Sequence, residues 1–331
     1  MKKWLALLMA ALMLLTFAAC GADNNDDDKK DPAPTPKTEV NVVAIAGPTG
    51  VGLANLWADS EADKTENDYN FTLVTDPQQA VAAIVNGSAD IAAVPTNLAA
   101  VLYQRTGEKV QVLAGNTGGV LYVIENGNTI QSFSDLKGKT VYSTGQGANP
   151  EYIMQYLLEE NQLVGEVDMQ FLSENNEMAA MLVKGTAKVA LVPEPLATTV
   201  LAKNKDLRVA LSINDEWDAV ADESLLMGCV IARTEFIEKN PKAVELFLDE
   251  YKDSIDAATA DVEKTAGYCA TYKIIAEAAI AKEAIPRCEL TFVTGAALKA
   301  KLTGFYEVFF AVKPQALGGK MPADGFYYGV E

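Results

Sequence analysis

The chain has 331 residues, of which 45 are acidic and 27 are basic, so its formal net charge is −18 at pH 7. This acidic balance argues against a nucleic-acid partner, because nucleic-acid binding requires a basic face. The sequence contains no histidine, which excludes Ser-His-Asp and Cys-His catalysis, histidine-based zinc sites and imidazole general bases.

Residues 1–20 have the order of a secretory signal: a basic start, an apolar run over 5–17 and a small-residue end before Cys20. The apolar run is too short to span a bilayer. A cysteine at this point resembles the lipobox of bacterial lipoproteins, which implies cleavage before Cys20 and lipidation of its sulfur. The alternative is an ordinary signal peptide with an incidental cysteine. We expect a lipoprotein signal peptide over residues 1–19.

Residues 20–38 are rich in Asp, Asn and Pro and almost free of apolar side chains. Such a segment buries too little surface to offset the entropy lost on ordering. We therefore expect a disordered tether that holds the body at the outer side of the cell membrane. The body that follows is long enough for two domains and has no second apolar run of membrane-spanning length.

The body repeats itself at an offset of 98 residues. Residues 86–99 align without a gap on residues 184–197, and seven of these fourteen positions are identical. Matches at the same offset continue on both sides of this window. One offset that persists over about 75 residues predicts two lobes of similar build.

Short apolar strands alternate with helices in both copies, which is typical of parallel sheet covered on both faces. In the first copy we expect strands at 40–46, 71–75, 91–94 and 110–115, and helices at 51–57, 77–85 and 98–105. In the second copy we expect strands at 140–143, 169–172, 189–192 and 207–212, and helices at 151–159, 176–184 and 196–203.

The pattern changes after residue 212. We expect strands at 227–233 and 289–294, and helices at 241–258, at 274–284 and through 310. The first lobe is expected to take back this last third. Lobe I then comprises residues 39–124 and 228–331, and lobe II comprises residues 125–227, with crossings near 122–126 and 225–228.

Three cysteines remain once Cys20 is assigned to lipid: Cys229, Cys269 and Cys288. A disulfide between Cys269 and Cys288 is one interpretation for an exported protein, and buried free thiols are the other. Three scattered cysteines without histidine do not make a metal site.

Ligands of open α/β sheets bind outside the carboxyl ends of the strands, and the repeat identifies these loops in both lobes. They are residues 47–50, 75–76, 95–97 and 115–117 in the first copy, and residues 144–149, 173–174 and 193–195 in the second. Each has a structural alternative. Glycine-rich turns can serve the backbone alone, Thr75 and Ser173 suit helix caps, and Glu194 either caps its helix or faces the cleft. Trp57 and Tyr152 either stack on a flat ligand or pack in the core.

The lipobox, the acidic tether, the two lobes and three segments resemble substrate-binding lipoproteins of bacterial ABC importers. The segments are 86–91, 133–141 and 230–241. More narrowly, the chain is similar to binders of nitrate, sulfonates, taurine and thiamine precursors (the NMT1/THI5-like, or SsuA/TauA-like, family). The resemblance implies a type II periplasmic-binding-protein fold of two doubly wound lobes, which close by a hinge around one small molecule and deliver it to a membrane permease.

The resemblance also implies ligand contacts from the strand-end loops. Carried onto this chain, they are Pro48, Thr49, Thr96, Asn97, Asn116, Gln146, Gly147 and Glu194. None of these loops carries Arg or Lys, so an anion would rely on N–H groups and hydroxyls. We expect a monomer with no catalytic residue, cofactor or metal. The alternatives are a sensory or surface-interaction lipoprotein that uses the cleft without transport, and an exported enzyme on this fold.

Overall fold

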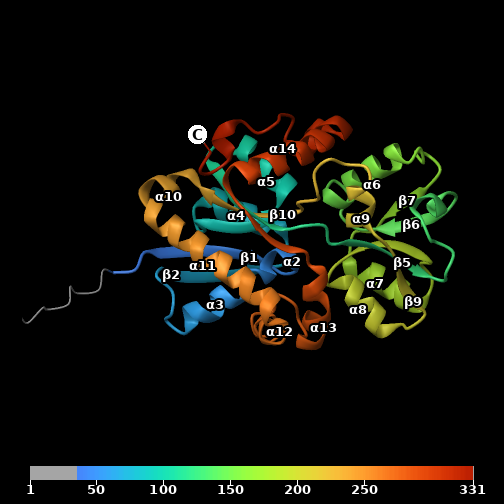
Figure 1. Cartoon of the computed structure of the whole chain (residues 1–331), viewed down its shortest axis with the longest axis horizontal. Helices are drawn as coiled ribbons and strands as arrows, with labels where there is room; N and C mark the ends of the chain where they lie inside the picture. Colours follow the sequence, from blue (N-terminus) through green and yellow to red (C-terminus); the bar gives the residue numbers. More distant parts are fainter. Residues whose placement is uncertain (1–35, 331) are drawn as a thin grey trace, which may run out of the picture. The chain divides into compact units, whose positions relative to one another are not determined.

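The computed structural model describes residues 36–330. The expected signal peptide, Cys20 and nearly all of the expected tether therefore lie outside the described residues. Two β-sheets with helices on both faces make up the described part (Figure 1).

The first sheet has six strands in the order β11-β4-β10-β3-β1-β2. Their bounds are β1 (Glu39–Ile45), β2 (Asp68–Val74), β3 (Ile91–Pro95), β4 (Val110–Thr117), β10 (Gly228–Arg233) and β11 (Leu290–Val293). The second sheet has five strands in the order β7-β6-β8-β5-β9. Their bounds are β5 (Leu121–Asn126), β6 (Thr140–Ser143), β7 (Asp168–Phe171), β8 (Val189–Pro193) and β9 (Leu207–Ser212).

Helices connect and cover these strands. Around the first sheet they are α2 (Pro48–Val51), α3 (Ala54–Glu61), α4 (Pro77–Asn86), α5 (Thr96–Arg105), α10 (Thr234–Lys239), α11 (Pro241–Ala260), α12 (Val262–Thr271), α13 (Ala278–Ala284) and α14 (Gly295–Val312). Those of the second sheet are α6 (Asn149–Glu160), α7 (Asn175–Lys184), α8 (Leu196–Lys203) and α9 (Ile213–Asp218). Short 3₁₀ helices are η1 (Phe133–Leu136), η2 (Ile285–Arg287), η3 (Pro314–Leu317) and η4 (Asp324–Phe326).

The sequence repeat is a structural repeat. Strands β2, β1, β3, β10 and β4 of the first sheet follow the same spatial order as β7, β6, β8, β5 and β9 of the second. The aligned helices α4 and α7 end on Gly87 and Gly185, whose φ angles are 79° and 72°. Glycine stops a helix at low cost in this left-handed conformation.

Each sheet is mixed, so the parallel sheet that the alternation of strands and helices indicated is only part of each sheet. Strand β10 runs antiparallel to β3 and β4, and β5 runs antiparallel to β8 and β9. These two strands immediately follow the passages between the sheets. The expected lobe boundary at residues 124 and 125 falls inside β5, all of which pairs in the second sheet, so the first crossing lies between Thr117 and Leu121.

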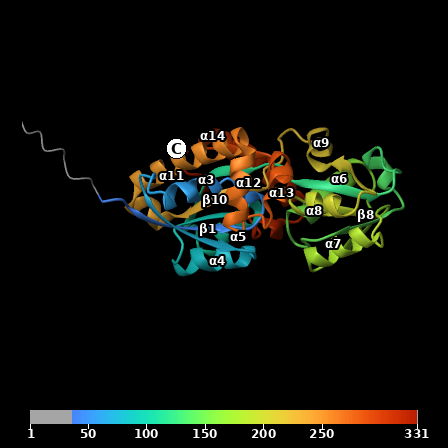
Figure 2. The same cartoon turned by 90° about the horizontal axis from the view of Figure 1, so that it is seen from below.

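Helices cover both faces of the first sheet, with α4 and α5 on one face and α3 and α11 on the other (Figure 2). On β1 and β3 the side chains of Val43, Ala92 and Val94 pack with α4 and α5, whereas those of Val42 and Ala93 pack with α3 and α11. The cluster on the α4 side continues through α14 and α6 into the second sheet. Because central strands such as β3 and β8 are buried on both faces, they consist of short apolar runs.

The expected helix over 274–284 is wrong in its first part. The chain is helical over α12 and α13, and Lys273, with φ at 63°, lies in the turn between them. A left-handed residue that is not glycine interrupts a helix. The following Ile274 is buried, and its carbonyl accepts the N–H of Gly47 at 2.9 Å. The loop thus supports a turn more than 200 residues earlier in the chain.

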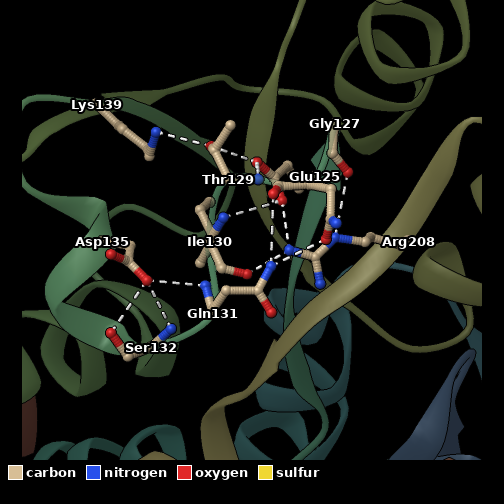
Figure 3. A network of polar contacts seen from close by, with 10 residues as sticks. Glu125, Gly127, Thr129, Ile130, Gln131, Ser132, Asp135, Lys139 and Arg208 are labelled. Atoms are coloured by element: carbon tan, nitrogen blue, oxygen red, sulfur yellow. Dashed lines mark hydrogen bonds and ion pairs between the residues drawn. The ribbon is translucent and has the colours of Figure 1, made fainter.

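A polar network closes the far end of the second sheet (Figure 3). The buried carboxylate of Glu125 accepts the N–H and hydroxyl of Thr129 at 2.8 and 2.6 Å and a guanidinium N–H of Arg208 at 2.7 Å. Asp135 accepts the N–H groups of Gln131 and Ser132, each at 2.9 Å. The network organises the loop before β6, which contains one of the segments behind the family resemblance.

The three described cysteines are buried free thiols. Cys269 and Cys288 belong to one apolar cluster beside α13, but both are free thiols. The structure therefore agrees with the interpretation of buried free thiols and contains no disulfide between them. None of the helices within residues 36–330 is long and apolar enough to cross a membrane.

Candidate ligand-binding cavity

A cavity of about 450 Å³ lies where the carboxyl ends of strands from both sheets meet. From the first sheet it is lined by residues 45–49 at the end of β1, by Thr75 and Pro77 after β2, and by Pro95 and Thr117 at the ends of β3 and β4. From the second sheet it is lined by residues 148–150, Asn175, residues 193–196 and Thr199. Its volume is in the range of small-molecule sites.

The turn after β1 is held in place from behind. Asn116 is 1 % exposed, and its amide donates to the carbonyl of Thr49 at 3.2 Å and to the hydroxyl of Tyr251 at 2.9 Å. Gly50 has no room for a side chain, because a Cβ would lie 2.3 Å from the carbonyl oxygen of Ile45. These contacts place Pro48 and Thr49 against the cavity.

The N-terminal end of α6 forms part of the opposite wall. Asn149 is 3 % exposed, lines the cavity and donates from Nδ2 to the carbonyl of Met227 at 3.1 Å. The same carbonyl accepts the N–H of Thr96 at 3.0 Å. The crossing segment before β10 therefore ties α6 of the second sheet to α5 of the first.

Glu194 follows β8 and is 2 % exposed. Its carboxylate accepts the N–H and hydroxyl of Thr198 at 3.2 and 3.1 Å, and Nη1 of Arg287 lies 3.6 Å from Oε1. Burial raises the pKa of Glu194, although the Thr198 and Arg287 contacts oppose the shift. Glu194 therefore does both things considered from the sequence. It lines the cavity, and it accepts an N–H from the helix that follows.

Three of the residues carried over from the family resemblance line this cavity: Pro48, Thr49 and Glu194. Thr96 and Asn97 begin α5 and are buried beside it, and the hydroxyl of Thr96 donates to the carbonyl of Leu226 at 2.8 Å. Asn116 supports the Thr49 turn from behind. Ligand contact by Thr96, Asn97 and Asn116 stays a prediction.

Gln146 and Gly147 are exposed in the turn before α6 and are not among the residues that line the cavity. The N–H of Gly147 donates to the Glu151 carboxylate at 2.5 Å. Ligand contact by either residue stays a prediction. The two aromatic candidates pack on protein, since Trp57 stacks between Phe71 and Tyr272 and Tyr152 meets Phe309 edge-on.

The residues carried over from the family resemblance do not include Asn149 and Thr199, which line the cavity, or Arg287, which contacts Glu194. Asn149 ends the predicted loop 144–149 and could have been chosen, because an amide at a helix start is a common polar contact. Arg287 follows α13 and reaches Glu194 from the other sheet, and no local pattern reports this. Among residues 36–330, no group of three or more Cys, Asp and Glu side chains is placed to hold a metal ion.

Comparison with known proteins gives one family match. Residues 57–241 match the family described as "ABC transporter, phosphonate, periplasmic substrate-binding protein". No curated protein matches the chain significantly in sequence.

Several solved structures share the fold. A crystal structure of an ABC transporter from Parabacteroides distasonis is 22 % identical, with a TM-score of 0.72 over 88 % of this chain and 99 % of that chain. The periplasmic aliphatic sulphonate binding protein SsuA from Escherichia coli is 15 % identical, with a TM-score of 0.72 over 89 % and 98 %. The alkanesulfonate-binding protein SsuA from Xanthomonas axonopodis pv. citri, bound to MOPS, is 14 % identical, with a TM-score of 0.64 over 90 % and 99 %. The fold is that of type II periplasmic-binding proteins.

Proposed function

The chain belongs to the family of phosphonate periplasmic substrate-binding proteins of ABC transporters, and on this premise we propose that it captures a small organic molecule between its two sheets and delivers it to a membrane permease. The observation that carries the proposal is the cavity, which residues from strand ends of both sheets line. A ligand that touches both sides stabilises the state in which the sides are close.

We further propose that the chain is a binding protein without enzymatic activity and that it acts outside the cytoplasm, in keeping with its family. The lipid anchor at Cys20, the monomeric state and the narrower nitrate- and sulfonate-binder group remain predictions. The sequence from Met1 to Cys20 supports the anchor.

A thermal-shift screen of the purified full chain tests solute binding. A ligand at one hundred times its dissociation constant adds about 2.7 kcal/mol to the free energy of unfolding, because it binds only the folded state. We expect one chemical class among amines, amides, sulfonates, phosphonates and heterocycles to raise the Tm by several degrees.

Two substitutions form a matched pair for this screen. The Thr199 hydroxyl donates to the Pro195 carbonyl at 2.9 Å and lines the cavity, whereas the Thr259 hydroxyl donates to the Asp256 carbonyl at 3.0 Å on an exposed helix end. Thr199→Phe should abolish the ligand-induced shift and Thr259→Phe should keep it. Equal shifts in both variants would place the ligand elsewhere.

A further inference from the structure

We propose that the cavity takes an uncharged or positively charged molecule with an apolar body and an N–H or O–H donor, in place of a phosphonate or sulfonate anion. This inference rests on the proposed function and names the class of its ligand. It starts from Asn149, whose Oδ1 is buried, without a hydrogen-bond partner, on a residue that lines the cavity.

The orientation of the Asn149 amide is fixed by its neighbour. Its Nδ2 donates to the carbonyl of Met227, so the flipped amide would set two acceptors against each other. Oδ1 is therefore the atom left over. A buried acceptor without a partner is costly, and a donor on the ligand would remove that cost. A phosphonate or sulfonate oxygen would instead add a second acceptor.

Two helix N-termini beside the cavity already have an acid group. Asp76 accepts the N–H of Gln78 in the first turn of α4, and Glu194 accepts the N–H of Thr198 in the first turn of α8. Free N–H groups at helix starts are what usually attract anions. At these two ends a carboxylate of the protein takes that role.

The rest of the wall has many acceptors, and its side-chain donors are the hydroxyls of Thr49 and Thr75 and the amide of Asn175. Six of the lining residues are prolines, which have no N–H to offer: Pro48, Pro77, Pro95, Pro150, Pro193 and Pro195. The hydroxyls of Thr117 and Thr199 donate to Asn116 Oδ1 and to the Pro195 carbonyl, each at 2.9 Å, so they face a ligand as acceptors. Asn175 accepts from Thr144 at 2.7 Å and keeps its amide N–H groups, which suit an amide carbonyl.

Charge points the same way. Among the described residues that line the cavity, Glu194 is the one charged side chain and none is Lys or Arg. The nearest guanidinium to that carboxylate, of Arg287, is 3.6 Å from it and does not line the cavity. A doubly charged anion would lose its hydration here without gaining a counter-charge.

Four probes with one shared phenyl body isolate the headgroup. Isothermal titration of the purified full chain with benzamide, benzylamine, benzenesulfonate and phenylphosphonate compares a donor-bearing pair with an oxyanion pair. We expect the first two to bind at least about tenfold more tightly, the effect of 1.4 kcal/mol. The converse ranking overturns the inference and leaves solute binding intact. If none of the four probes binds in the titration and no compound of the wider screen raises the Tm, both proposals are wrong.

Asn149→Ala tests the acceptor itself, with Thr234→Val as its matched control. Thr234 Oγ1 is the other buried oxygen without a partner among the described residues, and it lines a separate groove at the far end of β10. We expect the affinity for benzamide to fall about tenfold in Asn149→Ala and to stay unchanged in Thr234→Val. The Tm of Asn149→Ala without a probe measures the cost of losing the hydrogen bond to Met227. The ranking of the four probes is measured on the unaltered chain and does not depend on that Tm. Equal benzamide affinity in both variants overturns the inference.

Discussion

Two buried glutamates of the second sheet show how local partners decide the charge of the same residue type. Burial alone would raise the pKa of Glu125, but hydrogen bonds from Thr129, Ile130 and Arg208 outweigh it and lower that pKa. Burial dominates at Glu194, where fewer donors meet the carboxylate and its pKa is raised. The ionised form of Glu125 therefore favours folding, whereas the ionised form of Glu194 costs stability because of its burial.

The sign of this difference predicts how Arg287→Met responds to pH. A raised folded-state pKa means that the contribution of Glu194 to stability falls as pH rises through that pKa. Arg287 stabilises the ionised carboxylate alone. Its loss should lower the free energy of unfolding by about 1 kcal/mol at about pH 7.5, a small value because the arginine side chain is 40 % exposed, and by less at about pH 5.

Denaturant unfolding at both pH values measures this effect. Lys299→Met is the control, because its ion pair with Asp324 lies at the surface and involves no buried group. It should show the same small change at both pH values. A larger loss at low pH for Arg287→Met would contradict the assignment of the Glu194 charge.

At the scale of elements, β10 lies between β3 and β4 in the first sheet and begins directly after Met227, which lines the cavity. It begins at Gly228, where a Cβ would lie 2.5 Å from Cγ2 of Thr49, 2.6 Å from Oδ1 of Asn116 and 2.8 Å from Cβ of Thr117. Thr49 and Thr117 line the cavity. A side chain at position 228 would push against both residues and change the shape of the cavity.

Gly228→Ala should therefore affect both stability and binding. We expect the free energy of unfolding to fall by about 1–3 kcal/mol from overpacking and the affinity for a ligand to fall as Thr49 shifts. Calorimetry and ligand titration measure the two effects. In the control Gly267→Ala, on the exposed side of α12 with open space around it, we expect a gain of about 0.5–1 kcal/mol. If Gly228→Ala changes neither the free energy of unfolding nor the affinity, the Thr49 turn can move aside and this role of Gly228 is wrong.

At the scale of the whole molecule, two copies of one sheet order meet at a shared cavity, and the two strands that follow the crossings run against their neighbours. The crossing near Met227 also donates and accepts at the cavity wall. The cavity wall and the connections between the sheets thus share residues, and we expect a ligand in the cavity to affect how its two sides are arranged.

The anchor is a prediction at the same scale. Cys20→Ser should move the protein from the membrane fraction to the soluble extracytoplasmic fraction, because a lipid chain supplies membrane affinity that a serine does not. Immunoblots of the fractions measure this. Asn25→Ser, in the same segment, should leave the protein at the membrane. A membrane-bound Cys20→Ser chain would favour an ordinary signal peptide with an incidental cysteine.

Local signals in the sequence were sufficient for much of the fold. The alternation of short apolar strands with helices, and the glycines at 87 and 185, report conformations that neighbouring residues decide. The same holds for part of the site. Pro48, Thr49 and Glu194 follow strand ends, and the carboxyl ends of parallel strands lie at one edge whatever the rest of the chain does.

Long-range contacts decided the remainder. The sequence by itself determined the repeat, the α/β class and the loops that carry the site, because propensity and periodicity act over a few residues. Only the tertiary structure placed β5 in the second sheet, turned Asn116 toward Tyr251 and brought Arg287 to Glu194. It also left Asn149 Oδ1 without a partner. Each of these depends on residues far away in the chain, and packing and hydrogen-bond satisfaction select such partners only once the sheets have formed.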